Sequence, residues 1–254
     1  MTHTRTLIFF AAMSACTPSQ EAGRVQLPVT IDASTITDST NEEGWTVTMD
    51  TARIAVTDLQ FTIQGETHGV TAWLGDWLIP RAWAHPGHYA GGNVTGELTG
   101  AFIFDWFGHD GMMLGLADML VGDYNGINFT FRAADDGDGL AAEDPLLGHA
   151  AHFSGVARKD GEEVMFTAVL DINAGTQMVG APFELAVDDD TVATIAFQLE
   201  PTDPVEMKSM YDGLDFAALD DDGDGVVAIE PGSEAANVFR RTLQSHIHYQ
   251  AEAQ

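Results

Sequence analysis

The sequence has a single cysteine and few basic residues. Its 254 residues include 10 Lys and Arg against 39 Asp and Glu, so the formal net charge is −29. Cys16 alone can form no internal disulfide and cannot build a thiolate metal site. So negative a surface repels phosphate backbones, which excludes nucleic acid as a partner and makes divalent cations the expected partners. Hydrophobic residues make up 45% of the chain, enough for a core, so the charge does not indicate disorder.

The sequence also lacks the short motifs of common enzyme families. It contains no Gly-x-Ser-x-Gly elbow, no His-Glu-x-x-His pair, no Walker loop and no dinucleotide-binding fingerprint. Paired carboxylates carry no catalytic information in so acidic a chain, and no catalytic residue is assigned. The sequence therefore favours a protein that is not an enzyme. A hydrolytic metal centre is the enzymatic alternative that its histidines leave open.

The N-terminus has the organisation of a secretory signal. Arg5 precedes a short apolar run that ends at Met13, and small residues lead to Cys16. The run is too short to span a bilayer as a mature helix. We expect residues 1–15 to be a lipoprotein signal peptide, Cys16 to carry the lipid, and residues 16–24 to form a flexible tether. The alternative is an ordinary secretory signal in which Cys16 has no role.

Alternation of apolar and polar residues predicts β-strands through most of the chain. Residues 25–31 alternate strictly, and similar runs recur as far as residue 199 with turn residues between them. Asp160-Gly161 is typical of a hairpin turn, and a bend is expected near Asp58. Eight to ten strands with short polar turns indicate an antiparallel β-sandwich, jelly-roll- or immunoglobulin-like, over residues 25–200.

Two segments break the period of two. Residues 70–84 have an apolar stripe at helical spacing, which predicts a short helix covering one end of the sheet. After Pro201, residues 207–219 read as one helix and residues 233–249 as another, with Ser233 as N-cap. We therefore expect residues 201–254 to form a small helix–loop–helix appendage on the β-sandwich.

The loop between these last two helices resembles the start of an EF-hand calcium loop. Carboxylates stand at relative positions one, three and five, with Gly225 at position six. Such alternation lets hard oxygen ligands converge on one Ca²⁺ ion. Position twelve is Pro231 instead of the usual glutamate, so a neighbouring glutamate would have to close the site. The expected ligands are Asp220, Asp222, Asp224, the Val226 carbonyl, and Glu230 or Glu234.

A calcium ion in this loop is expected to be structural, because extracellular calcium is not a switched quantity. The alternative is an acidic loop that is satisfied by water alone. A second acidic turn offers only Asp136 and Asp138 in the same register, and we expect it to be a hairpin turn.

Histidines are the other candidate metal ligands. Pro86 and Gly87 separate His85 from His88 and favour a tight turn that presents both imidazoles on one side. Two nitrogens suit Zn²⁺ or Cu²⁺ but do not complete a site. We expect ligands from elsewhere in the chain to complete it, the candidates being His149, His152 and His246. Each of these could instead be a hydrogen-bonded structural histidine.

Several segments together resemble a group of predicted lipoproteins from Gram-negative bacteria of the myxobacterial type. The matching segments are the lipobox ending at Cys16, residues 44–49 with 52–56, residues 84–88 with the His-Pro-Gly-His motif, and residues 216–225. The resemblance implies a lipid anchor in the outer membrane and a single domain. It implies no activity.

Two functions follow from the sequence. The first is an extracytoplasmic lipoprotein that binds zinc or copper through a histidine cluster, with a structural calcium site, for metal capture, delivery or sensing. The second is a calcium-stabilised adhesion or interaction module of the cell envelope with incidental histidines. An exposed aromatic groove that used Trp83, Tyr89 or Trp106 would favour the second function, with a sugar or peptide as the partner.

Overall fold

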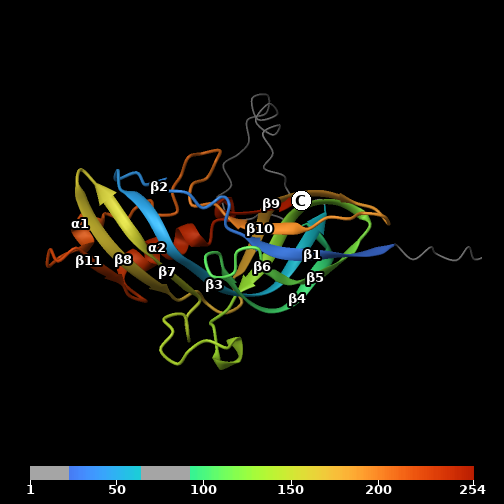
Figure 1. Ribbon diagram of the computed structural model, residues 1–254, viewed down its shortest axis with the longest axis horizontal. Coiled ribbons are helices and arrows are strands. Elements are labelled where there is room, and N and C mark those ends of the chain that lie inside the picture. The colour runs from blue at the N-terminus through green and yellow to red at the C-terminus, as the bar shows by residue number, and fades with distance from the viewer. Residues whose placement is uncertain (1–22, 64–91) are drawn as a thin grey trace, which may run out of the picture.

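The computed structural model describes residues 23–63 and 92–254 (Figure 1). The signal peptide, Cys16 and most of the tether lie outside the described residues. The same holds for the helix expected at residues 70–84 and for His85 and His88.

Strands make up most of the described chain. In order they are β1 (Arg24–Asp32), β2 (Ser39–Thr40), β3 (Thr46–Ile63), β4 (Asn93–Asp105), β5 (Met113–Leu120), β6 (Gly122–Phe131), β7 (Ala151–Lys159), β8 (Glu162–Leu170), β9 (Gln177–Val187), β10 (Ile195–Leu199), β11 (Val226–Ile229) and β12 (Tyr249–Ala253). The helices are short: α1 (Phe216–Leu219), α2 (Glu234–Leu243) and the 3₁₀ turns η2 (Asp136–Asp138) and η3 (His246–His248).

The strands pair in the order β11-β8-β7-β3-β4-β5-β1-β10-β12-β9-β6, and β6 pairs back onto β3. The strands from β3 round to β6 therefore form a closed circuit of pairings, while β7, β8 and β11 extend from the first half of the long strand β3 (Figure 1). The predicted β-rich, sandwich-like fold with little helix is confirmed. The sheet is mixed, however, because β1 with β10, β8 with β11 and β9 with β12 run parallel.

Local sequence accounts for many of these strands. In β1 the residues Leu27, Val29 and Ile31 are buried while their neighbours are exposed or partly exposed. The expected bend at Asp58 is confirmed by a positive φ of 51° and a shift of the β3–β4 register between Thr57 and Leu59. The hairpin turn at Asp160-Gly161, which joins β7 to β8, is also confirmed.

Aromatic side chains fill the interior of the closed circuit. The Phe104 and Phe197 rings lie 4.8 Å apart between centroids, and the Phe129 and Tyr249 rings 5.1 Å apart. Strands β4 and β10 are not neighbours in the sheet, so these rings meet across the interior. The core thus depends on Tyr249, which lies only a few residues from the C-terminal end of the sequence.

A second group of aromatic rings joins the C-terminal segment to β7 and to Trp45, the residue before β3. Phe239 on α2 lies 5.1 Å from Phe153 and 5.3 Å from Tyr211, and Phe216 on α1 packs against Trp45 at 5.7 Å. All five side chains are fully buried and belong to the same cluster as the first group. The segment expected to be an appendage therefore contributes to one continuous core.

The helices of the C-terminal segment are shorter than the sequence pattern suggests. The helix expected over residues 207–219 is reduced to α1, because Gly213 adopts a φ of 84° that ends any helix before it. The helix expected to reach Tyr249 ends at Leu243 instead. Residues 249–253 then pair with β10, which buries Tyr249 and Ala251, so tertiary packing decides their structure. Within the described residues no helix has the length and apolar character needed to cross a membrane.

Candidate functional site

The three expected aspartates of the acidic loop converge. Asp220, Asp222 and Asp224 each place a carboxylate oxygen within 4.8 Å of the other two. Asp222 and Asp224 are exposed and Asp220 is partly buried. Three carboxylates so close repel one another, and a divalent cation between them would offset that repulsion. Among the described residues, no other group of three histidine, cysteine or acidic side chains comes together in this way.

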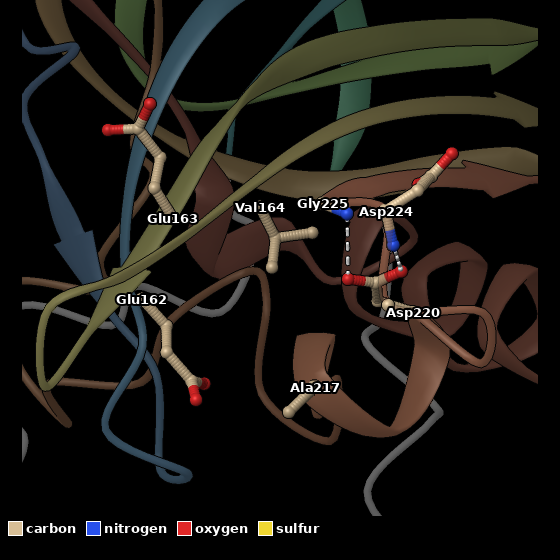
Figure 2. A pocket seen from close by; sticks show the side chains of 8 residues that line it. Glu162, Glu163, Val164, Ala217, Asp220, Asp224 and Gly225 are labelled. Atoms are coloured by element: carbon tan, nitrogen blue, oxygen red, sulfur yellow. Dashed lines mark hydrogen bonds between the residues drawn. The ribbon is translucent and has the colours of Figure 1, made fainter.

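Backbone N–H groups hold the carboxylate of Asp220 in place (Figure 2). The amide of Asp224 donates to one of its oxygens at 3.1 Å, and the amide of Gly225 donates to the other at 2.9 Å. The amide of Val226 donates to Asp224 at 2.8 Å. Gly223 and Gly225 adopt φ values of 72° and 78°, which only glycine adopts readily and which let the loop close.

The strand that follows the loop turns the carbonyl of Val226 away from β8. The amide of Met165 donates to the carbonyl of Gly225 at 2.8 Å, and β11 then runs parallel to β8. Successive carbonyls of a strand point to opposite sides, so the next one, on Val226, faces away from β8. This carbonyl is therefore available as the fourth oxygen expected from the sequence.

The structure does not bring Glu230 or Glu234 into the carboxylate group. Both are exposed, and Glu234 begins α2. Strand β11 carries the chain away from the loop at about 3.3 Å per residue, so Glu230 lies about 13 Å beyond Val226 along the strand. The expectation that one of these glutamates closes the site is not met, since the pairing of β11 with β8 keeps this segment extended.

A shallow pocket of about 490 Å³ borders the loop on its β8 side. Its lining adds the first residues of β8 to Asp220 and Asp224 (Figure 2). Glu162 and Glu163 point their carboxylates in opposite directions there, and Glu163 is held by Arg158 at 2.8 Å. The sequence offered no signal for Glu162, because only the β8–β11 pairing brings it near a loop almost sixty residues away.

In the second acidic turn, the Asp138 carboxylate already accepts hydrogen bonds from other groups of the chain. Arg132 donates to Asp138 at 2.7 Å, and this guanidinium lowers the pKa of the Asp138 carboxyl. The same carboxylate accepts from the amide of Asp135 at 2.7 Å, which caps the turn η2. The expected hairpin turn is wrong, because η2 lies in the connection from β6 to β7 and these two strands do not pair with each other.

Two of the candidate histidines form separate contacts. His149 lies 2.8 Å from the Asp171 carboxylate through Nδ1. His152 is buried, and its Nδ1 accepts a hydrogen bond from Arg53 at 2.8 Å. Burial, together with the charge of Arg53, lowers the pKa of His152, so the ring is neutral at pH 7. A metal at this nitrogen would have to displace a guanidinium.

The last pair of histidines is buried, unlike the arrangement expected from helical periodicity. A helix that continued through this pair would turn His246 towards the core and His248 towards solvent, but both are buried and His248 is 1% exposed. The helix ends before them, so its 100° step does not apply. The Nδ1 of His248 donates to the carbonyl of Glu200 at 2.8 Å. No described histidine shares a three-ligand group, and His85 and His88 lie outside the described residues.

One of the three aromatic residues considered for a sugar- or peptide-binding groove, Trp106, is not on the surface. Trp106 is fully buried and packs against Phe104 and Phe197, so it offers no face for stacking. Trp83 and Tyr89 lie outside the described residues.

Glu200 is a half-buried carboxyl beside the C-terminal strand. Burial, reinforced by the Glu252 carboxylate, raises its pKa from 4.5 to about 7, although Gln250 donates a hydrogen bond to it. A raised pKa means that the folded chain holds the proton more tightly. The contribution of this group to stability is therefore present below pH 4.5 and lost as the pH rises through 7.

Replacing Glu200 by glutamine is expected to raise the free energy of unfolding at pH 8 by about 1 kcal/mol, because it removes a carboxylate that is costly to ionise in the folded chain. Solvent screens the half-buried group, so the gain is smaller than the full pKa shift would give. At pH 4.5 the variant and the unaltered chain should be equally stable. Urea denaturation at the two pH values measures this, with the exposed Glu184→Gln on β9 as control. Equal stability of the Glu200→Gln variant and the parent at pH 8 would contradict a raised pKa of Glu200 in the folded chain.

The chain matches no protein-family model, no curated protein and no solved structure.

Proposed function

We propose that this chain is a calcium-stabilised interaction module, anchored by lipid in the Gram-negative cell envelope. The observation that carries the proposal is the convergence of the Asp220, Asp222 and Asp224 carboxylates, held by the backbone of their own loop. The ion would be structural: it joins the loop to β11, which is part of the sheet, and to α1, which is part of the core.

The envelope location rests on the N-terminal sequence. A signal-like run leads to Cys16, the single cysteine of the chain, and the chain is strongly acidic. Outside the cytoplasm, calcium is abundant enough to fill a site of modest affinity. The lipid on Cys16 would hold the module at the outer membrane and leave its surface to a protein or glycan partner.

A second candidate function is the capture, delivery or sensing of zinc or copper. The observation in its favour is the sequence His85-Pro-Gly-His88, whose Pro-Gly pair favours a turn that would present both imidazoles on one side. The ligands that complete this site would come from residues next to His85 and His88 in the sequence, or from His149, His152 or His246 after rearrangement of their present contacts.

Elemental analysis of the chain, purified without chelator and without a histidine tag, tests both functions. After equilibration with millimolar calcium, the calcium-stabilised module predicts about one equivalent of bound calcium, which falls in an Asp222→Asn variant and persists in Asp221→Asn. The second function predicts about one equivalent of zinc or copper, which disappears in the His85→Ala/His88→Ala double variant.

The two functions fail separately in this experiment. Absence of calcium at millimolar loading would refute the calcium site. Calcium with no transition metal, even after loading with zinc and copper, would refute metal capture and leave the histidines as structural residues.

A further inference from the structure

Strand β11 is the outermost strand of the sheet. The pairing order begins with β11, and in the part of the chain that the structure describes β8 alone pairs with it (Figure 1). The other side of β11 therefore carries backbone N–H and C=O groups that no neighbouring strand satisfies.

The register with β8 decides which backbone groups face this free edge. The amide of Met165 donates to the carbonyl of Gly225 at 2.8 Å, and Met165 stands opposite Val226 in the parallel pairing. The odd-numbered residues from Gly225 to Ile229 therefore direct their N–H and C=O towards β8, because these groups alternate sides along a strand. The even-numbered residues, Val226 and Ala228, direct theirs away from β8.

Ala228 is the centre of the free edge. The amide of Val226 is held by Asp224 at 2.8 Å, and its carbonyl is the expected calcium ligand. Both backbone groups of Ala228, and the amide of Glu230 two residues on, are directed outwards. The edge ends at Glu230, because its carbonyl accepts from the amide of Ser233 in the turn that leads to α2.

An exposed apolar row lies beside the free edge. Val226 is 50% exposed, and Met165, opposite it on β8, is 53% exposed. Val156 on β7 stands opposite Met165 in turn and is partly exposed. Ala228 is exposed on the same face of β11 as Val226. A strand added at the edge would place alternate side chains against this row.

Carboxylates lie at both ends of β11. Asp222 and Asp224 precede the strand, Glu230 and Glu234 follow it, and all four side chains are exposed. None of the four belongs to an ion pair among the described residues. Calcium in the loop would offset the charge of the two aspartates, but the two glutamates lie outside that group and keep theirs.

We propose that the free edge of β11 receives an extended segment of a partner protein, apolar in the middle and basic at both ends, as an added strand. The outward backbone groups of Ala228 select an extended backbone. The apolar row selects apolar side chains on one face of the segment, and the carboxylates at the two ends select lysine or arginine.

A second copy of this chain does not fit the same edge. Antiparallel pairing of two β11 strands would set the acidic start of one beside the acidic end of the other, and like charges so placed destabilise the pair. The inference rests on the proposed interaction module and names its binding surface.

The test uses the full chain and a fluorescent peptide of about seven residues, valine–threonine–valine with two lysines on each side. Fluorescence anisotropy should show saturable binding that weakens at high salt. A peptide of equal charge with three glycines in the centre should bind at least about tenfold more weakly, because it offers no apolar face and favours no strand. A peptide with glutamates in place of the lysines should not bind.

Two variants of Ala228 test the edge itself. Ala228→Pro removes the outward N–H and places a ring at the edge, so binding should weaken at least about tenfold. Proline is tolerated where an edge N–H faces solvent, so this variant should keep the circular dichroism of the parent. Ala228→Val keeps the N–H, and its affinity should stay within about twofold of the parent.

Residue-resolved hydrogen exchange on the unaltered chain provides a second measurement. The peptide should slow exchange of the Ala228 and Glu230 amides, which face the free edge, and leave the amides of β4 and β5 unchanged. Lack of binding, binding without this protection, or equal affinity of the two Ala228 variants would overturn the inference. Calcium content is measured separately, so loss of the calcium site with peptide binding intact is distinguishable from failure of the binding surface.

Discussion

Replacing Phe239 by alanine is expected to lower the free energy of unfolding by about 3–5 kcal/mol. The ring is fully buried on α2, between Phe153 of β7 and Tyr211 of the segment before α1. Its loss would leave a cavity that rigid strands on one side cannot fill. Because this cluster is continuous with the rest of the core, the whole chain should unfold at lower urea in one transition.

Circular dichroism reports the strands, and fluorescence of the buried Trp45 reports the junction with α1. The two signals should change together in the parent and in the Phe239→Ala variant. Tyr211→Phe is the matched control, because it keeps the ring and removes a buried hydroxyl that has no hydrogen-bond partner in the described structure. It should cost no stability. Two separate transitions, or a loss below about 1 kcal/mol for Phe239→Ala, would mean that the C-terminal segment folds on its own.

The strands were predictable where one face of the sheet is buried. The alternating residues 25–31 lie within β1, and the Asp160-Gly161 turn joins two strands as expected. The C-terminal strands were not predictable, because their structure depends on distant partners. The helix expected to reach residue 249 ends at Leu243, and residues 249–253 become a strand because they pair with β10 and bury Tyr249 against Phe129.

In the candidate site, too, local features were predictable from the sequence and features that depend on strand pairing were not. The three aspartates lie within five residues of one another, so local loop geometry brings them together and the sequence could predict it. Glu162 reaches the neighbouring pocket only through the parallel pairing of β11 with β8, which no local pattern encodes. The same pairing carries Glu230 away.

Calcium at about 10 mM is expected to raise the free energy of unfolding by about 2 kcal/mol, for a Kd of about 0.3 mM within the range of extracellular calcium modules. The Asp222→Asn variant should lose this gain. Without calcium it should be as stable as the parent or slightly more stable, because it removes one of three mutually repelling carboxylates while Asn can still accept from the amide of Asp224.

Thermal unfolding with calcium, and with chelator, measures both effects, and Asp221→Asn provides the control. Asp221 lies in the same loop, is exposed, and is outside the converging group, so its replacement makes the same change in net charge. Calcium should still stabilise that variant by nearly the full amount. If the two variants lost the calcium effect equally, or if sodium at equal ionic strength stabilised the parent as well, the gain would be charge screening over an acidic surface and the proposed site would be refuted.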